Sequence, residues 1–211
     1  MKTLRKIVKI SGLLTVLLAC FVGLVLTQSN NQAMAAKNRG KQTLVVYFSY
    51  KRNSDGKPLS VGNTARVAQD IQKKTGADTY EIKAARPYTG SYQHVVDQAQ
   101  REENRRARPA IAGSLPNVKK YKTVFVGGPI WWGEYPMVVY TFMDRVNLNH
   151  KTLIPFTTSE GSGLGNTSAA LKHKYPQARV RRGFTAVGNT VKNHPNAVAR
   201  RVNAWLDGLG Y

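Results

Sequence analysis

The chain has 211 residues, and its 32 Lys and Arg residues outnumber its 11 Asp and Glu residues to give a formal net charge of +21. This length accommodates one domain and an N-terminal leader. The single cysteine, Cys20, lies in that leader. Loss of the leader would therefore exclude disulfide scaffolds, thiol catalysis and cysteine-ligated metals from the mature protein.

The N-terminal 35 residues have the pattern of a secretory signal peptide. Four basic residues lie within residues 1–9, residues 10–26 are almost wholly apolar, and 33–35 form a small-x-small site. The apolar stretch is long for a signal peptide, so an uncleaved membrane anchor is the alternative. The segment ending at Cys20 loosely resembles a lipoprotein box, but apolar residues continue to Leu26. Whether the leader is cleaved or remains as an anchor, we expect it to direct export of the domain formed by residues 37–211. The domain would then be extracellular or associated with the cell envelope.

The exported domain is predicted to remain strongly basic. Residues 1–35 hold four Lys or Arg residues and no Asp or Glu, so the rest of the chain carries +17. This charge favours anionic surroundings, such as envelope polymers or lipid headgroups. The basic residues are dispersed and no nucleic-acid-binding motif accompanies them, so we expect no nucleic-acid partner. A basic surface that is only solvated is the plain alternative.

Five short segments predict strands, and helical segments with one apolar face follow them. The strands are expected at 43–49, 78–83, 122–126, 152–157 and 181–186, and the last helix at 195–209. The first, third and fourth strands are continuously apolar, which is typical of a parallel sheet buried on both faces. Trp205 falls on the apolar face of the last helix, which predicts a core residue. The alternation predicts one doubly wound α/β domain.

The loop after the first strand ends in Gly62-Asn63-Thr64, where a helix begins. The free N–H groups of a helix N-terminus bind phosphate, and hydroxyls of Ser49 and Thr64 with the Asn63 amide would complete such a cradle. The alternative is that Asn63 or Thr64 only caps the helix. The fingerprints of nucleoside triphosphate and dinucleotide sites are absent.

Two further loops follow the third and fourth strands. Residues 127–136 carry adjacent tryptophans within a frame of glycines and prolines, and residues 157–165 are rich in Gly, Ser and Thr. Ligands of open α/β sheets bind at the carboxyl ends of strands. The tryptophans suit a flat aromatic ligand, although they could be ordinary core or interface residues. A phosphate cradle, an aromatic wall and a loop of backbone donors together predict a phosphorylated planar heterocycle, and FMN meets all three demands.

The two loops carry a resemblance to a known family. Residues 127–133 read Gly-Gly-Pro-Ile-Trp-Trp-Gly and residues 156–163 read Phe-Thr-Thr-Ser-Glu-Gly-Ser-Gly. With these motifs, the chain from about residue 43 to its end resembles the flavodoxin-like family, in particular a bacterial branch with the Gly-x-Pro-Ile-Trp-Trp-Gly loop. The resemblance implies a three-layer, doubly wound, five-stranded parallel sheet of order 2-1-3-4-5, with FMN at its carboxyl end.

The resemblance also implies which residues bind FMN. The phosphate would be held by Ser49, Gly62, Asn63 and Thr64. The isoalloxazine would be flanked by Pro129, Ile130, Trp131, Trp132 and Gly133. Its other edge would be lined by Thr158, Ser159, Glu160, Gly161 and Gly163.

The sequence departs from the family pattern in its first loop and in its charge. Twelve residues separate Ser49 from Gly62, where the family has two. This insertion either folds over the phosphate as a basic flap or weakens its binding. Familiar flavodoxins are acidic and cytoplasmic, so their docking onto basic reductases does not carry over to this chain.

We expect an exported flavoprotein that carries electrons through FMN between a redox donor and an acceptor, without a catalytic side chain. An NAD(P)H-dependent quinone or flavin reductase on the same fold is the first alternative. A non-catalytic module that binds the cell envelope is the second. The four histidines are scattered outside the three loops, which favours solvated side chains and predicts no metal site.

Overall fold

The computed structural model describes residue 25 and residues 27–35, 38–53 and 55–211. The chain forms two compact units, residues 1–38 and 39–211. In the first unit, the described residues 25 and 27–35 are helical and exposed. The expected basic segment at 1–9, most of the apolar segment and Cys20 lie outside the described residues. Within the described ranges, no helix has the length and apolar character needed to cross a membrane.

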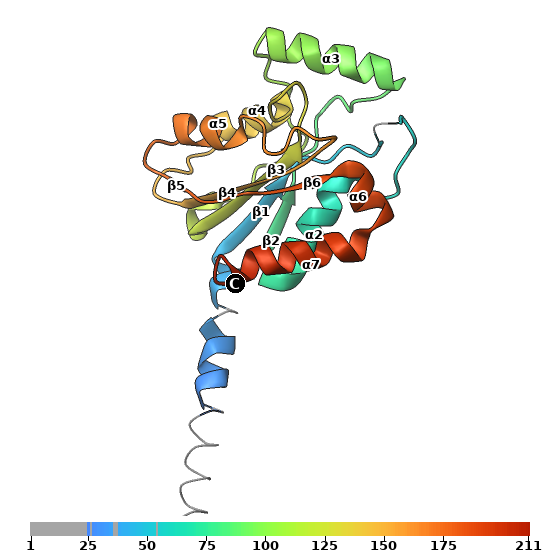
Figure 1. The fold of residues 1–211 in the computed structure, drawn as a ribbon. Helices are drawn as coiled ribbons and strands as arrows, with labels where there is room; N and C mark the ends of the chain where they lie inside the picture. The colour runs from blue at the N-terminus through green and yellow to red at the C-terminus, as the bar shows by residue number, and fades with distance from the viewer. Residues whose placement is uncertain (1–24, 26, 36–37, 54) are drawn as a thin grey trace, which may run out of the picture. The chain divides into compact units, whose positions relative to one another are not determined.

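The second unit contains a parallel sheet with strand order β2-β1-β3-β4-β5, and β6 also pairs with β4 (Figure 1). This order confirms the predicted one. The strands are β1 (Thr43–Tyr47), β2 (Asp78–Glu81), β3 (Thr123–Pro129), β4 (Thr152–Ser159), β5 (Arg179–Val180) and β6 (Phe184–Val187).

The strand predicted at 181–186 differs from the structure: β5 precedes this range, residues 181–183 belong to no strand, and β6 begins at Phe184. The carbonyl of Leu153 in β4 accepts a hydrogen bond from the N–H of Arg181. Backbone groups of alternate residues in a strand face the same neighbouring strand, so the backbone of Pro155 also faces the chain that follows β5. Proline has no N–H to donate there, and the ladder is interrupted. Gly183 passes this point so closely that a Cβ on it would lie 2.5 Å from the Pro155 carbonyl oxygen. The sequence of this segment predicts one continuous strand, because the pairing defect depends on Pro155 in the neighbouring strand.

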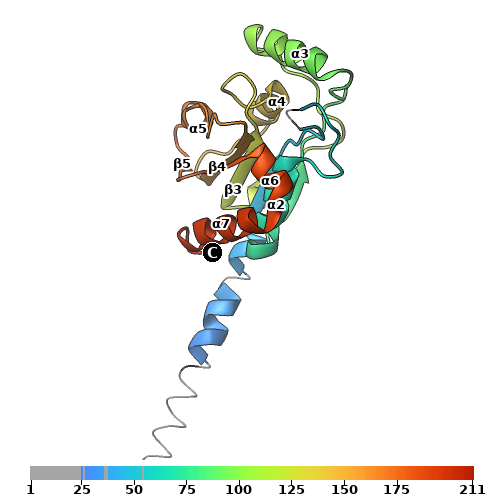
Figure 2. The same cartoon turned by 45° about the vertical axis from the view of Figure 1, so that its right-hand side comes forward.

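Helices cover both faces of the sheet (Figures 1 and 2). One face is covered by α2 (Asn63–Thr75), α6 (Gly188–Asn193) and α7 (Pro195–Asp207), and the other by α4 (Met137–Arg145) and α5 (Thr167–Lys174). A 3-10 turn, η1, spans Val118–Lys120. Trp205 of α7 is 6% exposed, which confirms the prediction that it is a core residue.

The sequence did not predict the short helix α6, because six residues are too few to show a helical repeat of apolar side chains.

Alternating residues of each central strand enter opposite cores. Val45 of β1 packs under α2 and α7, whereas Leu44 and Val46 pack in the α4 and α5 cluster. The same alternation holds in β3, where Phe125 is flanked by two valines that face the other way. Because both faces are buried, these strands carry few polar side chains until they reach their carboxyl ends.

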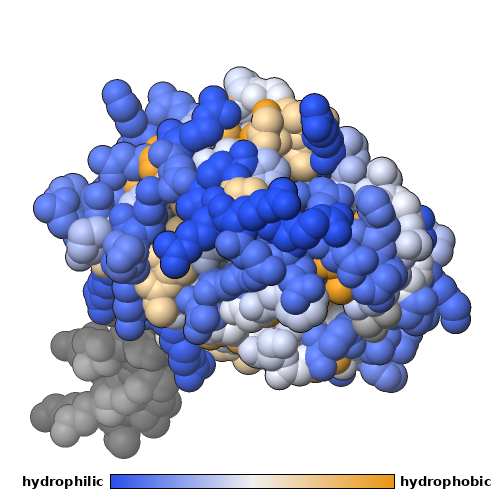
Figure 3. Space-filling model, turned by 90° about the horizontal axis from the view of Figure 1, so that it is seen from above, coloured by the Kyte–Doolittle hydropathy of each residue, from blue (hydrophilic) through white to orange (hydrophobic). Residues whose placement is uncertain are grey.

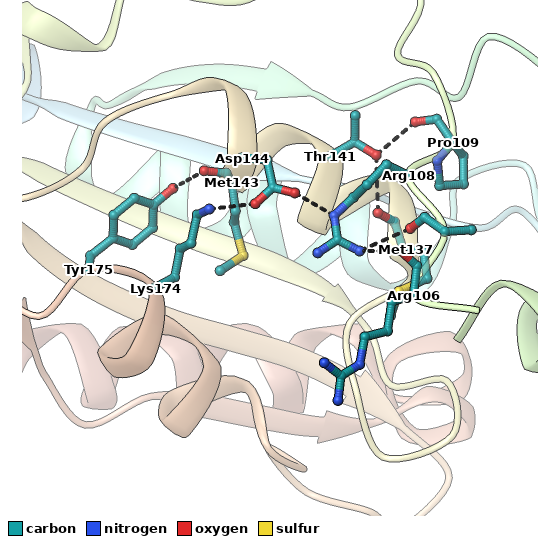
Figure 4. Close-up of polar contacts among 10 residues, drawn as sticks. Arg106, Arg108, Pro109, Met137, Thr141, Met143, Asp144, Lys174 and Tyr175 are labelled. Atoms are coloured by element: carbon teal, nitrogen blue, oxygen red, sulfur yellow. Dashed lines mark hydrogen bonds and ion pairs between the residues drawn. The ribbon is translucent and has the colours of Figure 1, made fainter. Parts of the chain in front are cut away.

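The helix α3 (Tyr92–Asn104) lies toward the carboxyl end of the sheet in both ribbon views (Figures 1 and 2). A polar cluster secures the chain that follows it (Figure 4). Asp144 of α4 accepts hydrogen bonds from Arg108 and from Lys174 of α5, and Thr141 donates to the Pro109 carbonyl at 2.8 Å. Although partial burial opposes it, these two cations lower the pKa of Asp144. The cluster therefore ties the exit of α3 to α4 and α5.

Gly127 supplies a test of the packing between β3 and β4. A Cβ on Gly127 would lie 2.1 Å from Cζ of the buried Phe156 ring. We expect Gly127→Ala to lower the free energy of unfolding by about 3 kcal/mol, because the ring has to leave its position. Urea unfolding monitored by circular dichroism measures this change.

Gly208→Ala is the matched control. Gly208 has φ −65° and an added Cβ would meet nothing closer than 3.4 Å. This variant should be neutral or more stable by less than about 1 kcal/mol. Equal unfolding midpoints for the two variants would contradict the close approach of Gly127 to Phe156.

Candidate functional site

A cavity of about 340 Å³ opens where the carboxyl ends of β1, β3 and β4 meet. Its volume is within the usual range for small-molecule sites. It is lined by Tyr50, Arg52, Asn53, Asn63, Thr64, Tyr92, Val95, Val96, Ala99, Pro129, Ile130, Trp131, Trp132, Thr158, Ser159, Glu160 and Gly188. Polar side chains come mainly from α2, the segment before it and the end of β4, whereas apolar ones come from α3 and the tryptophan loop.

The N-terminus of α2 forms part of the polar wall. Ser49 does not line the cavity; its Oγ accepts a hydrogen bond from the N–H of Ala65 at 3.0 Å. Ser49 thus caps α2, since the N-cap residue Gly62 has no side chain to do so. Gly62 passes so close to Ser49 that a Cβ on it would lie 2.3 Å from Oγ. Thr64 is buried, and its Oγ1 shares a hydrogen bond with Thr158 Oγ1 at 2.7 Å.

The insertion between Ser49 and Gly62 folds back on itself. We call residues 51–53 and 55–59 the insertion arm. Its two sides pair through an antiparallel bridge between Arg52 and Pro58, with a hydrogen bond from the N–H of Asn53 to the Lys57 carbonyl at 2.9 Å. Asn53 is 3% exposed and lies between two other asparagines: it donates to Asn189 of α6 at 2.6 Å and accepts from Asn63 of α2 at 3.4 Å. These hydrogen bonds of Asn53 therefore hold the insertion arm against the wall of the cavity.

The two tryptophans have different surroundings. Trp131 is contacted edge-on by Phe48, Tyr50 and Tyr88, with ring centroids 5.0–5.7 Å apart. Trp132 is 51% exposed, and its indole N–H donates to the Val96 carbonyl at 3.3 Å. Trp131 is therefore a fixed wall of the pocket, and Trp132 stands at its mouth against α3.

A tight turn produces this arrangement. Backbone hydrogen bonds join Trp131 and Glu134 in both directions, at 2.9 and 3.0 Å. The two residues between them, Trp132 and Gly133, have φ of 53° and 84°. Two positive φ angles are the signature of a type I′ turn, in which glycine is favoured and tryptophan is strained. Gly133 thus serves the turn and does not line the cavity.

The third loop contributes Thr158, Ser159 and Glu160 to the lining but neither Gly161 nor Gly163. Both glycines have positive φ, at 132° and 60°, so they shape the loop. Across from them, Gly188 leaves room for Glu160. A Cβ on Gly188 would lie 2.4 Å from Glu160 Oε1 and 2.9 Å from Asn63 Nδ2.

Two buried polar atoms at the pocket lack a hydrogen-bond partner in the described part of the chain. They are the hydroxyl of Tyr50 and Oδ1 of Asn63, and both residues line the cavity. Asn63 is only 9% exposed. Burial raises the pKa of Tyr50, an effect that the nearby Arg52 opposes, so the hydroxyl stays protonated at neutral pH. An unsatisfied buried polar atom costs about 1–3 kcal/mol, which makes both atoms candidates for contacts with a ligand.

The structure brings the three predicted loops together at one cavity. Nine predicted residues line it: Asn63, Thr64, Pro129, Ile130, Trp131, Trp132, Thr158, Ser159 and Glu160. Five do not: Ser49, Gly62, Gly133, Gly161 and Gly163. The roles of all fourteen residues in cofactor binding stay a prediction.

Eight lining residues are not among the predicted site residues: Tyr50, Arg52, Asn53, Tyr92, Val95, Val96, Ala99 and Gly188. Of these, Arg52 and Asn53 belong to the insertion, for which a basic flap over the phosphate was one of the two expectations. The apolar spacing of Val95, Val96 and Ala99 was visible, but it indicated only a face turned inward. In α3 that face closes the cavity. Within the described residues, no group of three or more His, Cys, Asp or Glu side chains could hold a metal ion.

Comparison with known proteins agrees with this architecture. A flavodoxin family model matches residues 42–205. The chain belongs to the flavodoxin family.

Solved structures resemble this chain to different degrees. A candidate flavoprotein from Bacteroides eggerthii DSM 20697 is 32% identical, with 81% of this chain and 98% of that one covered and a TM-score of 0.63. One from Bacteroides uniformis ATCC 8492 is 29% identical, with 80% and 99% covered and a TM-score of 0.65. A Lactobacillus acidophilus NCFM flavoprotein, solved in complex with FMN, shares the fold at 17% identity, with 72% and 97% covered and a TM-score of 0.57. No functionally curated protein matches the sequence.

The cap on α2 can be tested directly. We expect Ser49→Ala to lower the free energy of unfolding by about 1 kcal/mol, because the N–H of Ala65 loses its acceptor. Ser60→Ala, which changes an exposed serine of the same segment, should have no measurable effect. Chemical unfolding of both variants measures the difference, and a Ser49→Ala variant as stable as the wild type would show that the hydrogen bond does not hold the helix.

Proposed function

We propose that this flavodoxin binds FMN in the described cavity and transfers electrons through it outside the cytoplasmic membrane. The observation that carries the proposal is the pair of unpartnered buried atoms, Tyr50 Oη and Asn63 Oδ1, in a cavity with an aromatic wall. Tyr50 offers a hydrogen-bond donor, whereas Asn63 Oδ1 needs one. FMN carries ring carbonyls as acceptors and ribityl hydroxyls as donors, so it can satisfy both atoms.

The two kinds of wall match the two ends of FMN. The N–H groups at the start of α2 and the hydroxyls of Thr64, Thr158 and Ser159 suit a phosphate and a ribityl chain. The apolar wall formed by α3 and the tryptophan loop suits the isoalloxazine. The fold also supports the proposal, because the Lactobacillus acidophilus flavoprotein of the same fold was solved with FMN.

Bound FMN would supply the redox chemistry, and the chain would supply its surroundings. Trp131 cannot tilt freely between its three aromatic neighbours, so it presents one fixed surface to the cavity. Val95 and Ala99 of α3 exclude water from the apolar side. Tyr50 holds a proton at Oη and can donate it in a hydrogen bond, and no side chain has to act as a nucleophile.

The location is proposed from sequence and charge. The leader pattern at 1–35 supports export, and the net charge of +17 over the rest of the chain supports anionic surroundings such as envelope polymers or lipid headgroups. The end of the molecule that carries α3 has a mostly hydrophilic surface (Figure 3), which is compatible with such contacts.

A reductase is the second candidate function, and the mouth of the cavity favours it. Trp132 and Tyr92 are 51% and 44% exposed, and both line the cavity from different elements. They offer aromatic surface to a second planar molecule, such as a quinone or a nicotinamide. This reading requires direct reduction of the bound flavin by NAD(P)H.

Titration with FMN tests the proposed function. The full chain in mild detergent should bind one FMN per molecule and quench both tryptophan and flavin fluorescence, because the ring would contact the tryptophan loop. Addition of NAD(P)H under anaerobic conditions then separates the two candidates: rapid bleaching supports a reductase, and a lasting yellow colour supports a carrier that needs another donor. If the flavin spectrum stays unchanged at high protein concentration, both candidate functions are wrong.

Tyr50→Phe tests the observation on which the proposal rests. Without the hydroxyl, FMN should bind about 1 kcal/mol more weakly, which is roughly fivefold. The ligand-free protein should be as stable as the wild type or slightly more stable, because an unsatisfied buried group is gone. Tyr47→Phe is the control, since Tyr47 packs against the opposite core. A loss of stability without FMN would indicate that the Tyr50 hydroxyl has a structural role instead.

A further inference from the structure

The insertion arm brings a positive charge to the cavity. Lys51, Arg52 and Lys57 are exposed basic residues of the arm, but only Arg52 lines the cavity. Glu160 is the acidic residue among the described lining residues, and Arg52 is the basic one. Arg52 is therefore the one lining side chain, among the described residues, that carries a full positive charge toward an anionic ligand.

The position of Arg52 is fixed by the structure of the arm. One of its guanidinium nitrogens, Nη1, donates to the Gly56 carbonyl at 2.9 Å. Its neighbour Asn53 is buried and hydrogen-bonded to Asn189 at 2.6 Å. Farther along, Asp55 lies 4.0 Å from Lys192 of α6. The Asn53–Asn189 hydrogen bond therefore attaches the arm to α6, and the more distant Asp55–Lys192 pair adds only a weak contact beside it.

The arm also reaches the N-terminus of α2. Asn63, the first residue of that helix, is nine-tenths buried, and its Nδ2 donates to Asn53 Oδ1. Its own Oδ1 has no hydrogen-bond partner among the described residues. The arm thus determines which end of the Asn63 amide is free toward the cavity. Burial raises the pKa of Tyr50, and the charge of the nearby Arg52 partly opposes this rise. The unpartnered atoms and the arm consequently belong to one site.

We propose that the insertion is an anion-binding element of the cavity, in which Arg52 binds the phosphate of a phosphorylated ligand beside the start of α2. The inference rests on the proposed function and makes FMN, as a phosphate monoester, the expected ligand. Helix N–H groups supply only partial charge, and the guanidinium supplies a full charge and several donors that fit phosphate geometry. The insertion lengthens the first loop and adds a contact that a short loop has no residue to make.

The experiment compares Arg52→Gln with Lys51→Gln in the full chain. Both variants remove one positive charge from adjacent positions of the same arm, but Lys51 does not line the cavity. Dissociation constants are measured for FMN and for riboflavin, which lacks the phosphate, by flavin fluorescence at low and high salt. Inorganic phosphate is added as a competitor in a separate series.

We expect Arg52→Gln to weaken FMN binding by roughly tenfold, with less than about a twofold effect on riboflavin, because a charge-assisted contact to phosphate is lost. The variant should also show a smaller dependence on salt and weaker competition by inorganic phosphate. Lys51→Gln should change both constants by less than about twofold.

Three results would overturn the inference while the wild type still binds FMN. The first is an unchanged FMN constant in Arg52→Gln, and the second is an equal loss in Lys51→Gln, which would indicate a general effect of net charge. The third is an equal loss for riboflavin, which would indicate collapse of the pocket. A wild type that fails to bind FMN would instead overturn the proposed function.

Discussion

Burial of the central strands on both faces is the constraint from which the rest of the domain follows. Val45 and Phe125 face one core and their strand neighbours face the other, so β1 and β3 have no surface along their length for polar chemistry. All polar groups of these strands that can meet a ligand are displaced to the carboxyl ends, where the chain leaves the sheet. Because the strands are parallel, their carboxyl ends lie at one edge of the sheet. The topology alone therefore brings the three loops together at this edge.

Within this frame, small residues determine how closely the loops approach. Gly62 allows Ser49 to cap α2, Gly188 admits Glu160 and the Asn63 amide, and Gly133 completes the turn that points Trp132 outward. At each of these positions a side chain would collide with a neighbour or strain the backbone. The glycines of the site motifs thus mainly determine the backbone geometry that positions the lining residues. Four of the five predicted residues that do not line the cavity, Gly62, Gly133, Gly161 and Gly163, have this physical explanation.

Sequence reasoning was strongest where the signal is local. Continuous apolar runs identified β1, β3 and β4. The motif residues 129–132 and 158–160 were placed at the cavity because they lie at or directly after the carboxyl ends of these strands. It failed where a residue's role depends on a partner far along the chain. Nothing near Asn53 indicates that Asn189 will bury it, because α6 itself was not predicted. The division of β5 from β6 likewise depends on Pro155 in the neighbouring strand. The capping of α2 by Ser49 depends on the distance from its Oγ to the N–H of Ala65, which lies sixteen residues along the chain.

The cavity retains features that stability alone would remove. The Tyr50 hydroxyl and the Asn63 Oδ1 atom have no hydrogen-bond partner among the described residues, and Trp132 has a positive φ. Each of these features costs about 1–3 kcal/mol. A domain whose total stability is about 5–15 kcal/mol tolerates such costs only when the remaining core compensates for them. Here two extensive cores lie directly beneath the site, one on each face of the sheet. The stability of these cores therefore offsets the cost of polar groups that lack hydrogen-bond partners at the carboxyl edge of the sheet. Those polar groups are the ones that can form hydrogen bonds with a ligand.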